Sequence, residues 1–300
     1  MLLSIIIVSF NTQEFLINCL NSIFEGSSID SMNNIEIIVV DNASTDKSVE
    51  LVKKSFPHVK LIENEKNLGF AKANNIGIKN AVGEFILLLN SDTILPPHTL
   101  ESLLNYIKEN KDLDVLGIKL LNSDHSVQYS LGYLPNLFNI LLWMTFLDDL
   151  PFLKKILPAY HISDKDFYDH KREVGWVSGA FFLIGKHCIE EIGSLDEQIF
   201  MYGEEVEWCQ RLKNKGFKVI YSPSIEIIHL KGKSGSGKYA GIIEEFKALE
   251  YFFSKHKPAW QKPLLRLILK VGALLRLILF GIISGDREKA TIYAKAFKMA

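Results

Sequence analysis

The chain has 300 residues, of which 48% are hydrophobic and 23% are charged. These values are typical of a globular protein and exclude a disordered, collagen-like or coiled-coil chain. The length allows one large α/β domain with an appendage, or two small domains. The three cysteines, Cys19, Cys188 and Cys209, form no C-x-x-C pair. This argues against a disulfide framework and a cysteine-rich zinc site, and it fits a reducing compartment.

The net charge of −1 hides an asymmetry between the two ends of the chain. Residues 231–300 contain 14 Lys and Arg against 5 Asp and Glu, a net charge of +9, whereas residues 1–230 carry −10. An acidic body argues against nucleic-acid binding, and a basic tail predicts an anionic partner. The apolar run after Met1 has no basic region before it and no cleavage site after it, so we expect a buried strand there and not a signal peptide.

Strand-like and helix-like stretches alternate through the first 120 residues. We expect strands at 3–9, 35–40, 59–62, 84–89 and 115–118, and helices at 15–24, 70–81 and from Pro96 to about 109. This alternation predicts right-handed βαβ units around a mainly parallel sheet. In such sheets ligands bind beyond the carboxyl ends of the strands.

The second half of the chain is less regular. Residues 120–173 hold three prolines and several aromatic residues, and we expect an irregular insertion there. A strand at 174–184, a polar helix at 204–215 and a strand at 217–221 follow, and a Gly/Ser/Lys loop occupies 232–237.

Polar residues follow two of the expected strands. Asp41-Asn42-Ala43-Ser44-Thr45-Asp46 could form a helix cap, or Asp41 could accept a hydrogen bond from a ligand. Asn90-Ser91-Asp92 could also cap a helix, or it could hold a divalent cation with its phosphates.

Two further sets of residues have both a structural and a chemical interpretation. Glu204, Glu205 and Glu207 begin a helix, where acids suit the macrodipole. They also follow an aromatic run that could raise a carboxyl pKa and make a general base. His229 is either a structural histidine or a ligand-binding one.

Taken together, these segments resemble glycosyltransferase family 2, and in particular its rhamnosyltransferase-type branch. The resemblance covers roughly residues 3–240, with its motifs in the family's order. They are 4–11, Asp41-Asn42-x-Ser44-x-Asp46, Asn67-x-Gly69-Phe70-Ala71, Leu89-Asn90-Ser91-Asp92, Gly179-Ala180, Asp196-Glu197 through Glu204-Glu205-x-Glu207 to Arg211, and His229-x-x-Gly232.

The resemblance implies a GT-A fold, a Rossmann-like sheet with flanking helices, and an inverting transfer from a nucleotide-diphosphate sugar. It implies that Asp41 pairs with uracil or thymine, and that Asp92, with His229, binds Mg²⁺ or Mn²⁺ although Asn90 replaces the first acid of the family's motif. It makes Glu205 the catalytic base, a role that Glu204 could share. The implied donor-binding residues are Ser9, Asn11, Asp41, Asn42, Asn67, Gly69, Asn74, Asn90, Ser91 and Asp92, and the implied acceptor-binding residues are Trp176, Gly179, Ala180 and Asp196.

The expected function is therefore a metal-dependent hexosyl transfer in cell-surface polysaccharide synthesis. A dTDP- or UDP-linked sugar, first of all dTDP-rhamnose, would be the donor, and a saccharide or lipid-linked saccharide would be the acceptor. The alternative is a nucleotide-sugar-binding or scaffold protein of the same fold that has lost catalysis, which the departures at Asn90 and Glu205 would explain.

The basic tail contains a helix of spanning length that is interrupted by charges. Residues 264–283 are mostly apolar, but Lys262, Arg266, Lys270 and Arg276 fall within an arc of roughly 120° on one helix face. We expect an amphipathic helix on the cytoplasmic face of the cell membrane, with this stripe against anionic head groups. A core helix or a homodimer helix is the alternative. The expected domains are 1–240, with donor (1–118) and acceptor (119–240) halves, and a membrane-associating tail at 241–300.

Overall fold

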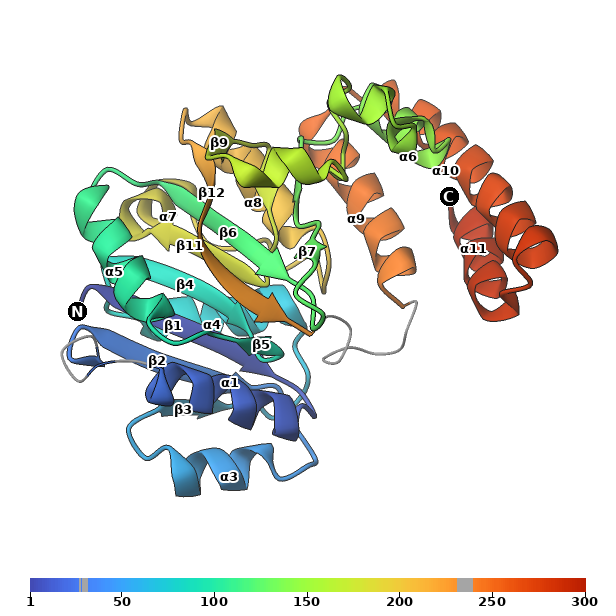
Figure 1. Ribbon diagram of the computed structural model, residues 1–300. Coiled ribbons are helices and arrows are strands. Elements are labelled where there is room, and N and C mark those ends of the chain that lie inside the picture. Colours follow the sequence, from blue (N-terminus) through green and yellow to red (C-terminus); the bar gives the residue numbers. More distant parts are fainter. Residues whose placement is uncertain (27, 29–31, 231–239) are drawn as a thin grey trace.

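The computed structural model describes residues 1–26, 28, 32–230 and 240–300, and a mixed sheet lies at its centre (Figure 1). The sheet has the strand order β3-β2-β1-β4-β11-β6-β12-β5, with β7 beside β6 and β9 beside β12. Its strands are β1 (Leu3–Ser9), β2 (Ile35–Asp41), β3 (Lys60–Glu63), β4 (Phe85–Asn90), β5 (Thr93–Ile94), β6 (Val115–Leu121), β7 (Val127–Gln128), β9 (Arg172–Glu173), β11 (Phe181–Gly185) and β12 (Val219–His229). The loop expected at 232–237 lies outside the described residues.

Helices cover both faces of this sheet, and further helices lie to one side of it (Figure 1). They are α1 (Gln13–Glu25), α3 (Ser48–Ser55), α4 (Phe70–Asn80), α5 (Thr99–Glu109), α6 (Leu137–Met144), α7 (Lys186–Ile192), α8 (Glu204–Asn214), α9 (Ala240–His256), α10 (Gln261–Ile278) and α11 (Arg287–Met299). Short 3₁₀ helices occupy Leu147–Asp149, Leu153–Lys155 and Lys165–Asp169, and a π-helical turn, Leu279–Ile283, extends α10.

The central strands are apolar on both faces because both faces are covered. Ile5 and Ile7 of β1 point into the layer that contains α1 and α5, whereas Ile6 points into the layer that contains α4 and α8. All three side chains are fully buried. An uninterrupted apolar run is therefore what this position in the sheet requires.

The mainly parallel sheet expected from the sequence is present, with one change at its centre. β3, β2, β1 and β4 pair in parallel, as do β6 and β12. The expected strand at 174–184 divides at 178–180 into β10 (Trp176–Val177), which pairs with β8 (Leu131–Gly132), and β11. β11 lies antiparallel between β4 and β6. The insertion at 120–173 is only partly irregular, since it contains β7, β8 and α6.

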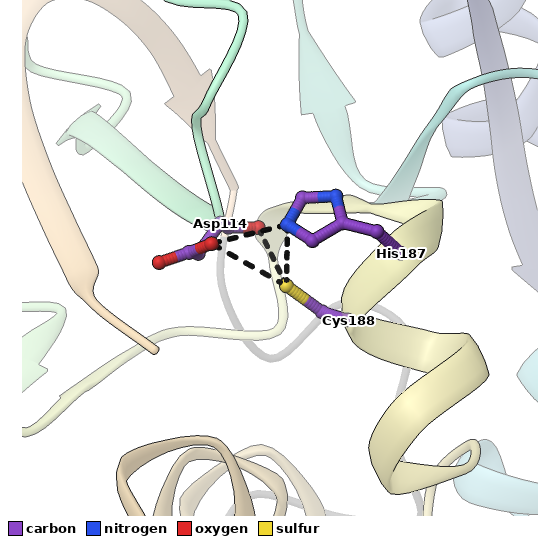
Figure 2. Close-up of side chains that lie close together, drawn as sticks. All are labelled: Asp114, His187 and Cys188. Carbon is purple, nitrogen blue, oxygen red and sulfur yellow. Dashed lines mark hydrogen bonds and ion pairs between the residues drawn. The ribbon is translucent and has the colours of Figure 1, made fainter. Parts of the chain in front are cut away.

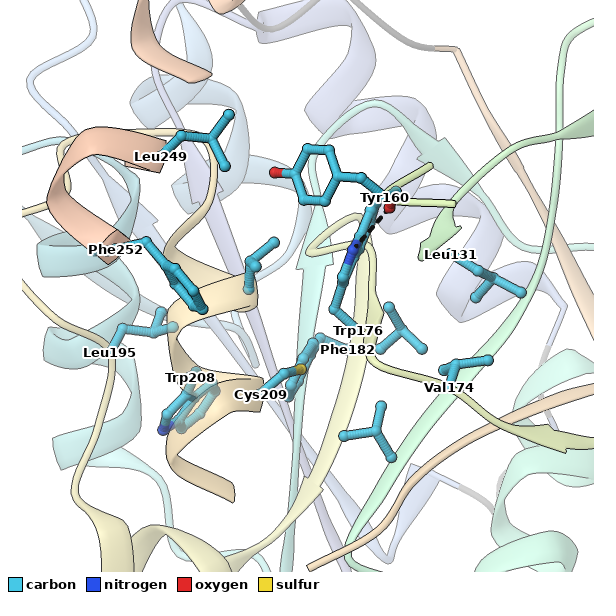
Figure 3. Packing of buried hydrophobic residues seen from close by; sticks show 14 of the residues in the cluster. Leu131, Tyr160, Val174, Trp176, Phe182, Leu195, Trp208, Cys209, Leu249 and Phe252 are labelled. Atoms are coloured by element: carbon cyan, nitrogen blue, oxygen red, sulfur yellow. Dashed lines mark hydrogen bonds between the residues drawn. The ribbon is translucent and has the colours of Figure 1, made fainter. Parts of the chain in front are cut away.

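The C-terminal helices share the hydrophobic core of the sheet. Leu249 and Phe252 of α9 lie in the same cluster as Trp208 of α8 and Phe182 of β11, and Figure 3 shows these side chains together. Trp208 stacks on Phe182 with ring centroids 5.3 Å apart. The tail is therefore packed against the body over α9, whereas α10 and α11 extend away from the sheet (Figure 1).

Arg276 on α10 corrects the expected arrangement of the basic stripe. Its side chain is buried, and its guanidinium donates hydrogen bonds to the carbonyl oxygens of Met144 (2.6 Å) and Trp143 (2.7 Å). It also lies over the Phe146 ring at 4.2 Å. Arg276 therefore joins α10 to the end of α6 and does not face head groups. In the described part of the chain, no helix combines the length and the apolar character that crossing a membrane requires.

Glu207 is the buried centre of a charged cluster that joins α8 to α9. Its fully buried carboxylate accepts from Arg211 Nε (2.9 Å), Lys255 Nζ (2.8 Å) and His256 Nε2 (3.0 Å). Burial alone would raise the pKa of Glu207. The hydrogen bonds from His256 and Lys255 and the charge of Arg211 hold that pKa below its usual value. Glu207, the third acid at the start of α8, thus has a structural role, because it holds α9 against α8.

We expect Glu207→Gln to lower the free energy of unfolding by about 3 kcal/mol, because it leaves partly buried cations without their partner. Urea denaturation would measure this. The pKa of Glu207 in the folded protein is lower than in the unfolded chain. The loss of unfolding free energy should therefore be complete above the ordinary Glu pKa of about 4.3, and it should shrink as the pH falls through the lowered pKa of Glu207. Glu191→Gln is the control, since its ion pair with Lys215 lies at the surface and should contribute less than about 1 kcal/mol. Equal losses in the two variants would contradict the assignment.

Candidate active site

Strand register brings the polar loops of the first half to one sheet edge. Ser9, the last residue of β1, is level with Asp41 on β2, and Val8 is level with Asn90 on β4. The loops that leave this edge contain non-glycine residues with positive φ, namely Asn11 (53°) and Ala43 (66°). Such backbone outliers concentrate at functional sites because the surrounding structure must hold them.

Hydroxyl and amide groups tie these loops to one another. Ser9 Oγ lies 2.9 Å from Thr12 Oγ1, which donates to Ser91 Oγ at 3.2 Å. Asn11 Oδ1 accepts from the backbone N–H of Thr45 at 2.7 Å. The structure thus brings together Ser9, Asn11 and Ser91, which were predicted as donor-binding residues, and uses their side chains to fix the loops.

The remaining predicted amides shape the loop before α4. Asn42 Nδ2 donates to the carbonyl oxygen of Gly69 at 3.2 Å, and Asn67 Oδ1 accepts from the Gly69 N–H at 2.9 Å. Asn74 Nδ2 donates to the Phe70 carbonyl at 3.0 Å. Gly69 has φ +84°, and a Cβ there would collide with the backbone of Phe200. Only glycine therefore allows the 196–203 loop to close on this turn.

Asp41 combines burial with an unused acceptor atom. Its Oδ2 accepts from the Ser44 N–H at 2.8 Å, and its side chain is 3% exposed. Its Oδ1 is buried and has no hydrogen-bond partner within the described part of the chain. A buried carboxylate oxygen without a donor is costly, so this atom is suited to a ligand N–H.

Asp92 and His229 meet where β5 pairs with the end of β12. His229 Nε2 lies 3.2 Å from Asp92 Oδ1 and 3.3 Å from Asn90 Nδ2. Gln128 Nε2 donates to the His229 carbonyl at 3.0 Å, which leaves its Oε1, 2.6 Å from His229 Nδ1, to accept a hydrogen bond from that nitrogen. The Gln128 amide therefore keeps a proton on His229 Nδ1, and His229 Nε2 faces Asp92 Oδ1.

This donor set fits a divalent cation. A carboxylate and an imidazole are both accepted by Mn²⁺, and a hydrogen bond that fixes the distal ring nitrogen is typical of histidine ligands. Asp92 and His229 would hold the ion, with Asn90 beside them. Sequence reasoning missed Gln128, because it lies 101 residues from His229 and no local pattern marks it.

The carboxyl groups of Glu204, which is buried, and Glu205, which is half-buried, neighbour each other at the start of α8. Gly203 N–H donates to Glu205 Oε2 at 3.1 Å, whereas Glu204 Oε2 is buried without a partner among the described residues. Burial, and then the Glu205 charge, raise the pKa of Glu204 well above its usual value. Burial also raises the pKa of Glu205, although backbone hydrogen bonds from its own N–H and that of Gly203 oppose the shift.

These differences divide the roles of the two acids. Two neighbouring carboxyl groups with little exposure resist ionising together, so the acid whose pKa burial raises further keeps its proton. That acid is Glu204, although its own N–H and that of Tyr202 donate to it, and Glu205 ionises first. Positive φ values at Tyr202 (67°) and Gly203 (90°) aim the start of α8 into the site. Glu205 is therefore the better candidate for a general base.

Of the predicted acceptor-side residues, Gly179 lies beside Glu204, and the others make different contacts. The Gly179 Cα faces Glu204, because a Cβ on it would lie 3.8 Å from Glu204 Oε1. The Ala180 carbonyl accepts from the Asn90 N–H at 3.1 Å. Buried Trp176 donates from Nε1 to the Tyr160 carbonyl at 3.1 Å (Figure 3).

Asp196 is held by α9. Its Oδ2 accepts from Tyr251 Oη at 2.7 Å and from Lys255 Nζ at 2.5 Å. These contacts lower the pKa of Asp196 to about 2 despite the opposing effect of burial. The structure thus gives Asp196 a joining role, and its contact with an acceptor stays a prediction.

A second group that the sequence did not reveal lies beside Trp176. His161 Nε2 is 2.8 Å from Glu245 Oε1 of α9, and the His161 ring meets that of Trp176 edge-on at 5.4 Å. The charge of Glu245 contributes to the raised pKa of Glu205. Three distant segments supply these side chains, so no local motif could have marked them.

Comparison with known sequences identifies relatives of this chain. A model described as Glycosyl transferase family 2 matches residues 4–164. An N-acetylglucosaminyl-diphospho-decaprenol L-rhamnosyltransferase of Mycobacterium tuberculosis is 26% identical over 243 residues, which are 77% of this chain and 78% of that protein. A low-salt glycan biosynthesis hexosyltransferase of Haloferax volcanii is 24% identical over 287 residues, 92% of this chain and 84% of that protein.

Solved structures show the same fold. A mannosyltransferase from Pyrobaculum calidifontis, in complex with GDP-Man and Mn²⁺, aligns with a TM-score of 0.57 and 17% identity over 98% of this chain and 80% of that one. Staphylococcus aureus TarS 1-349 in complex with UDP aligns with a TM-score of 0.54 and 16% identity over 99% and 90%. The GT-A fold expected from the sequence is confirmed.

We expect Glu205→Gln to lower activity by about 10² or more while the fold is kept, the usual effect of losing a positioned base. Because Glu204 keeps its proton while Glu205 ionises, Glu204→Gln replaces one neutral group by another. It should therefore keep most of the activity and leave the acidic limb of the pH–activity profile in place. Steady-state rates across pH, with circular dichroism of both variants, would check this. Loss of activity in Glu204→Gln alone would reverse the two roles.

Glu204→Gln should stabilise the protein, whereas Glu207→Gln should destabilise it. Burial raises the Glu204 pKa above its unfolded value, so ionising it costs folding free energy at higher pH. Glu204→Gln should raise the melting temperature near pH 8 and leave it unchanged near about pH 4, where the acid is protonated in both states. A lower melting temperature at about pH 8 would show that the ionised carboxylate is stabilising.

Proposed function

The chain belongs to glycosyl transferase family 2, and we propose that it moves a sugar with inversion from a dTDP- or UDP-linked donor to a saccharide or lipid-linked saccharide. One observation carries the proposal: strand register places Asp41, the Asp92–His229 pair and Glu204 with its neighbour Glu205 at the edge where β2 and β4 end. The mycobacterial relative, named as a rhamnosyltransferase with a lipid-diphosphate acceptor, makes dTDP-rhamnose the first donor to test.

Donor binding follows from the first-half loops. The free Oδ1 of Asp41 would accept the ring N–H of a uracil or thymine base, a hydrogen bond that cytosine cannot offer. Asp92 and His229 would hold Mg²⁺ or Mn²⁺ beside the diphosphate. When bound, such a cation would neutralise the charge that the diphosphate gains as the sugar leaves.

Acceptor activation follows from the start of α8. Glu205 would take the proton of the acceptor hydroxyl as its oxygen attacks the anomeric carbon from the face opposite the diphosphate. The bond to the diphosphate oxygen breaks, and the diphosphate departs as an anion. One base is sufficient, because the leaving group needs no proton. Trp176, Gly179, Ala180 and Asp196 are the proposed acceptor side.

A lipid-linked acceptor would require the protein to work at a membrane surface. The outer face of α10 is an exposed apolar ridge, formed by Leu264, Leu267, Val271, Leu274, Leu275 and Ile278. Exposed Lys270 lies at the flank of this ridge, and Phe152 and Ile156 are exposed on the insertion that includes α6. An apolar face flanked by cations is typical of helices that lie in the interface of an anionic bilayer.

We propose that this apolar ridge attaches the protein peripherally to the cytoplasmic face of the cell membrane. The ridge is the face opposite Leu265, Leu269 and Arg276, which are buried against the protein. Membrane contact would thus come from the apolar side of α10 and not from the basic stripe. A homodimer formed through the ridge is the competing outcome.

The donor test is thermal stabilisation by a panel of nucleotide sugars, with and without Mn²⁺, followed by transfer to a lipid-diphosphate saccharide. We expect dTDP- or UDP-linked sugars to raise the melting temperature in a metal-dependent way, since a ligand of the native state stabilises it. Stabilisation by CDP-linked sugars only would contradict the role given to Asp41, because the cytosine ring offers no N–H.

Two variants separate base recognition from metal binding. Asp41→Ala should weaken nucleotide affinity about 10-fold or more, as expected for a hydrogen bond to a charged group. Asp92→Asn should remove the effect of Mn²⁺ on that affinity. Exposed Glu109, the last residue of α5 before the start of β6, lies at the opposite ends of the strands and gives the control Glu109→Gln. Calorimetry that shows unchanged affinity in both site variants would refute the donor site.

We expect Leu267→Glu with Val271→Glu to abolish sedimentation with anionic vesicles, because two charges would enter the acyl region. Val82→Glu is the matched control, since Val82 is equally exposed but lies far from α10, in the turn before β4. Analytical ultracentrifugation would be run on the same proteins. Unchanged vesicle binding, or a dimer that the double variant dissociates, would overturn the membrane assignment.

A further inference from the structure

We propose that Asp114, His187 and Cys188 form a second cation site, suited to Zn²⁺, that is separate from the candidate active site (Figure 2). The three side chains converge from two segments that are far apart in the sequence. Asp114 directly precedes β6, and His187 and Cys188 lie in the first turn of α7. This inference does not depend on the proposed function.

The site lies at the sheet edge opposite the active site. Gly185, just before α7, is level with Phe85 at the start of β4, whereas Asn90 is at the other end of that strand. A Zn²⁺ ion bound here would therefore have no contact with donor or acceptor.

The ligand atoms already have the spacing of a coordination shell. His187 Nε2 lies 3.1 Å from Asp114 Oδ1 and 3.2 Å from Cys188 Sγ, and Sγ lies 3.8 Å from Oδ1. In a tetrahedral zinc site, with bonds of about 2.0–2.3 Å, ligand atoms stand roughly 3.2–3.8 Å apart. All three could thus bind one ion with little movement, and water would complete the tetrahedron.

The surrounding backbone holds the ligands in place. Asp114 Oδ2 accepts from the Lys218 N–H at 2.8 Å, and the Asp114 carbonyl accepts from the Gly185 N–H at 2.8 Å. The His187 ring lies against Gly185, where a Cβ would collide with it, and meets Phe217 edge-on at 5.8 Å. Asp114 Oδ1 therefore stays directed at the other two ligands.

Access and ligand type both favour a thiophilic ion. Cys188 is buried, but His187 is half exposed and opens the site to solvent. A thiolate with an imidazole selects Zn²⁺ over Mg²⁺ or Mn²⁺, which prefer oxygen ligands. Burial and the Asp114 carboxylate raise the pKa of the Cys188 thiol to about 12, so the metal-free protein keeps that proton. On binding, the proton passes to solvent as the S–metal bond forms.

An ion here would fasten three elements. Asp114 already contacts the N–H before β12 and the N–H that ends β11, and the ion would add α7 to this junction. Binding to the native state alone raises stability by mass action. The proposed role is thus structural.

The test is titration of the full, reduced chain with Co²⁺, which reports a thiolate ligand through its sulfur-to-cobalt charge-transfer band. We expect one equivalent of Co²⁺ to bind and to produce this band. Zn²⁺ should displace the bound Co²⁺ and should raise the melting temperature of the protein. Cys188→Ser should lose the band, and Cys19→Ser, which removes another buried thiol, should keep it. His187→Ala should weaken binding at least 10-fold, and exposed His58→Ala should not.

Three outcomes would overturn the proposal. They are no thiolate band in the wild type, a band that survives in Cys188→Ser, and Zn²⁺ binding that is lost in Asp92→Asn but kept in His187→Ala. If Cys188→Ser fails to fold, the metal affinity of His187→Ala is the deciding measurement, because His187 is exposed. Unchanged affinity in that variant would then overturn the proposal. No readout uses enzymatic activity, so a failed donor assignment would leave this result unaffected.

Discussion

Parallel register between β2, β1 and β4 is the constraint from which the candidate site follows. Since Ser9 is level with Asp41 and Val8 with Asn90, the polar residues after these strands have to meet at one edge. The second half of the chain closes on that edge with His229 at the end of β12 and Glu204 at the start of α8. Acids gathered in this way make the edge suited to a cation, which would in turn attract the diphosphate of a donor.

The sequence was sufficient for features that depend on local pattern. Continuous apolar runs located the central strands, because a strand covered on both faces has no polar side. The positions of Asp41 and Asp92 directly after such strands placed them at the ligand edge before any geometry was known. The resemblance to a family then assigned roles that pattern alone left open, such as a base at Glu205.

What the sequence could not supply depends on contacts between distant residues. Gln128, which keeps a proton on His229 Nδ1, lies in a two-residue strand. Arg276 looked like part of a basic stripe because helical spacing cannot tell a face that meets lipid from one that meets backbone carbonyls. The acids at the start of α8 also look alike in the sequence. Glu207 is nevertheless neutralised by cations of α9, whereas Glu204 Oε2 has no hydrogen-bond partner among the described residues.

The place of β11 has a consequence for how the chain is made. β4 and β6 are not neighbours, because β11 separates them, and Leu183 lies between Leu87 and Leu116. During synthesis the apolar edge of β4 therefore stays unpaired until residues 181–185 have left the ribosome. An open, apolar strand edge invites pairing with other chains. Translational pausing shortly before β11 should thus favour aggregation, and pausing shortly after it should not.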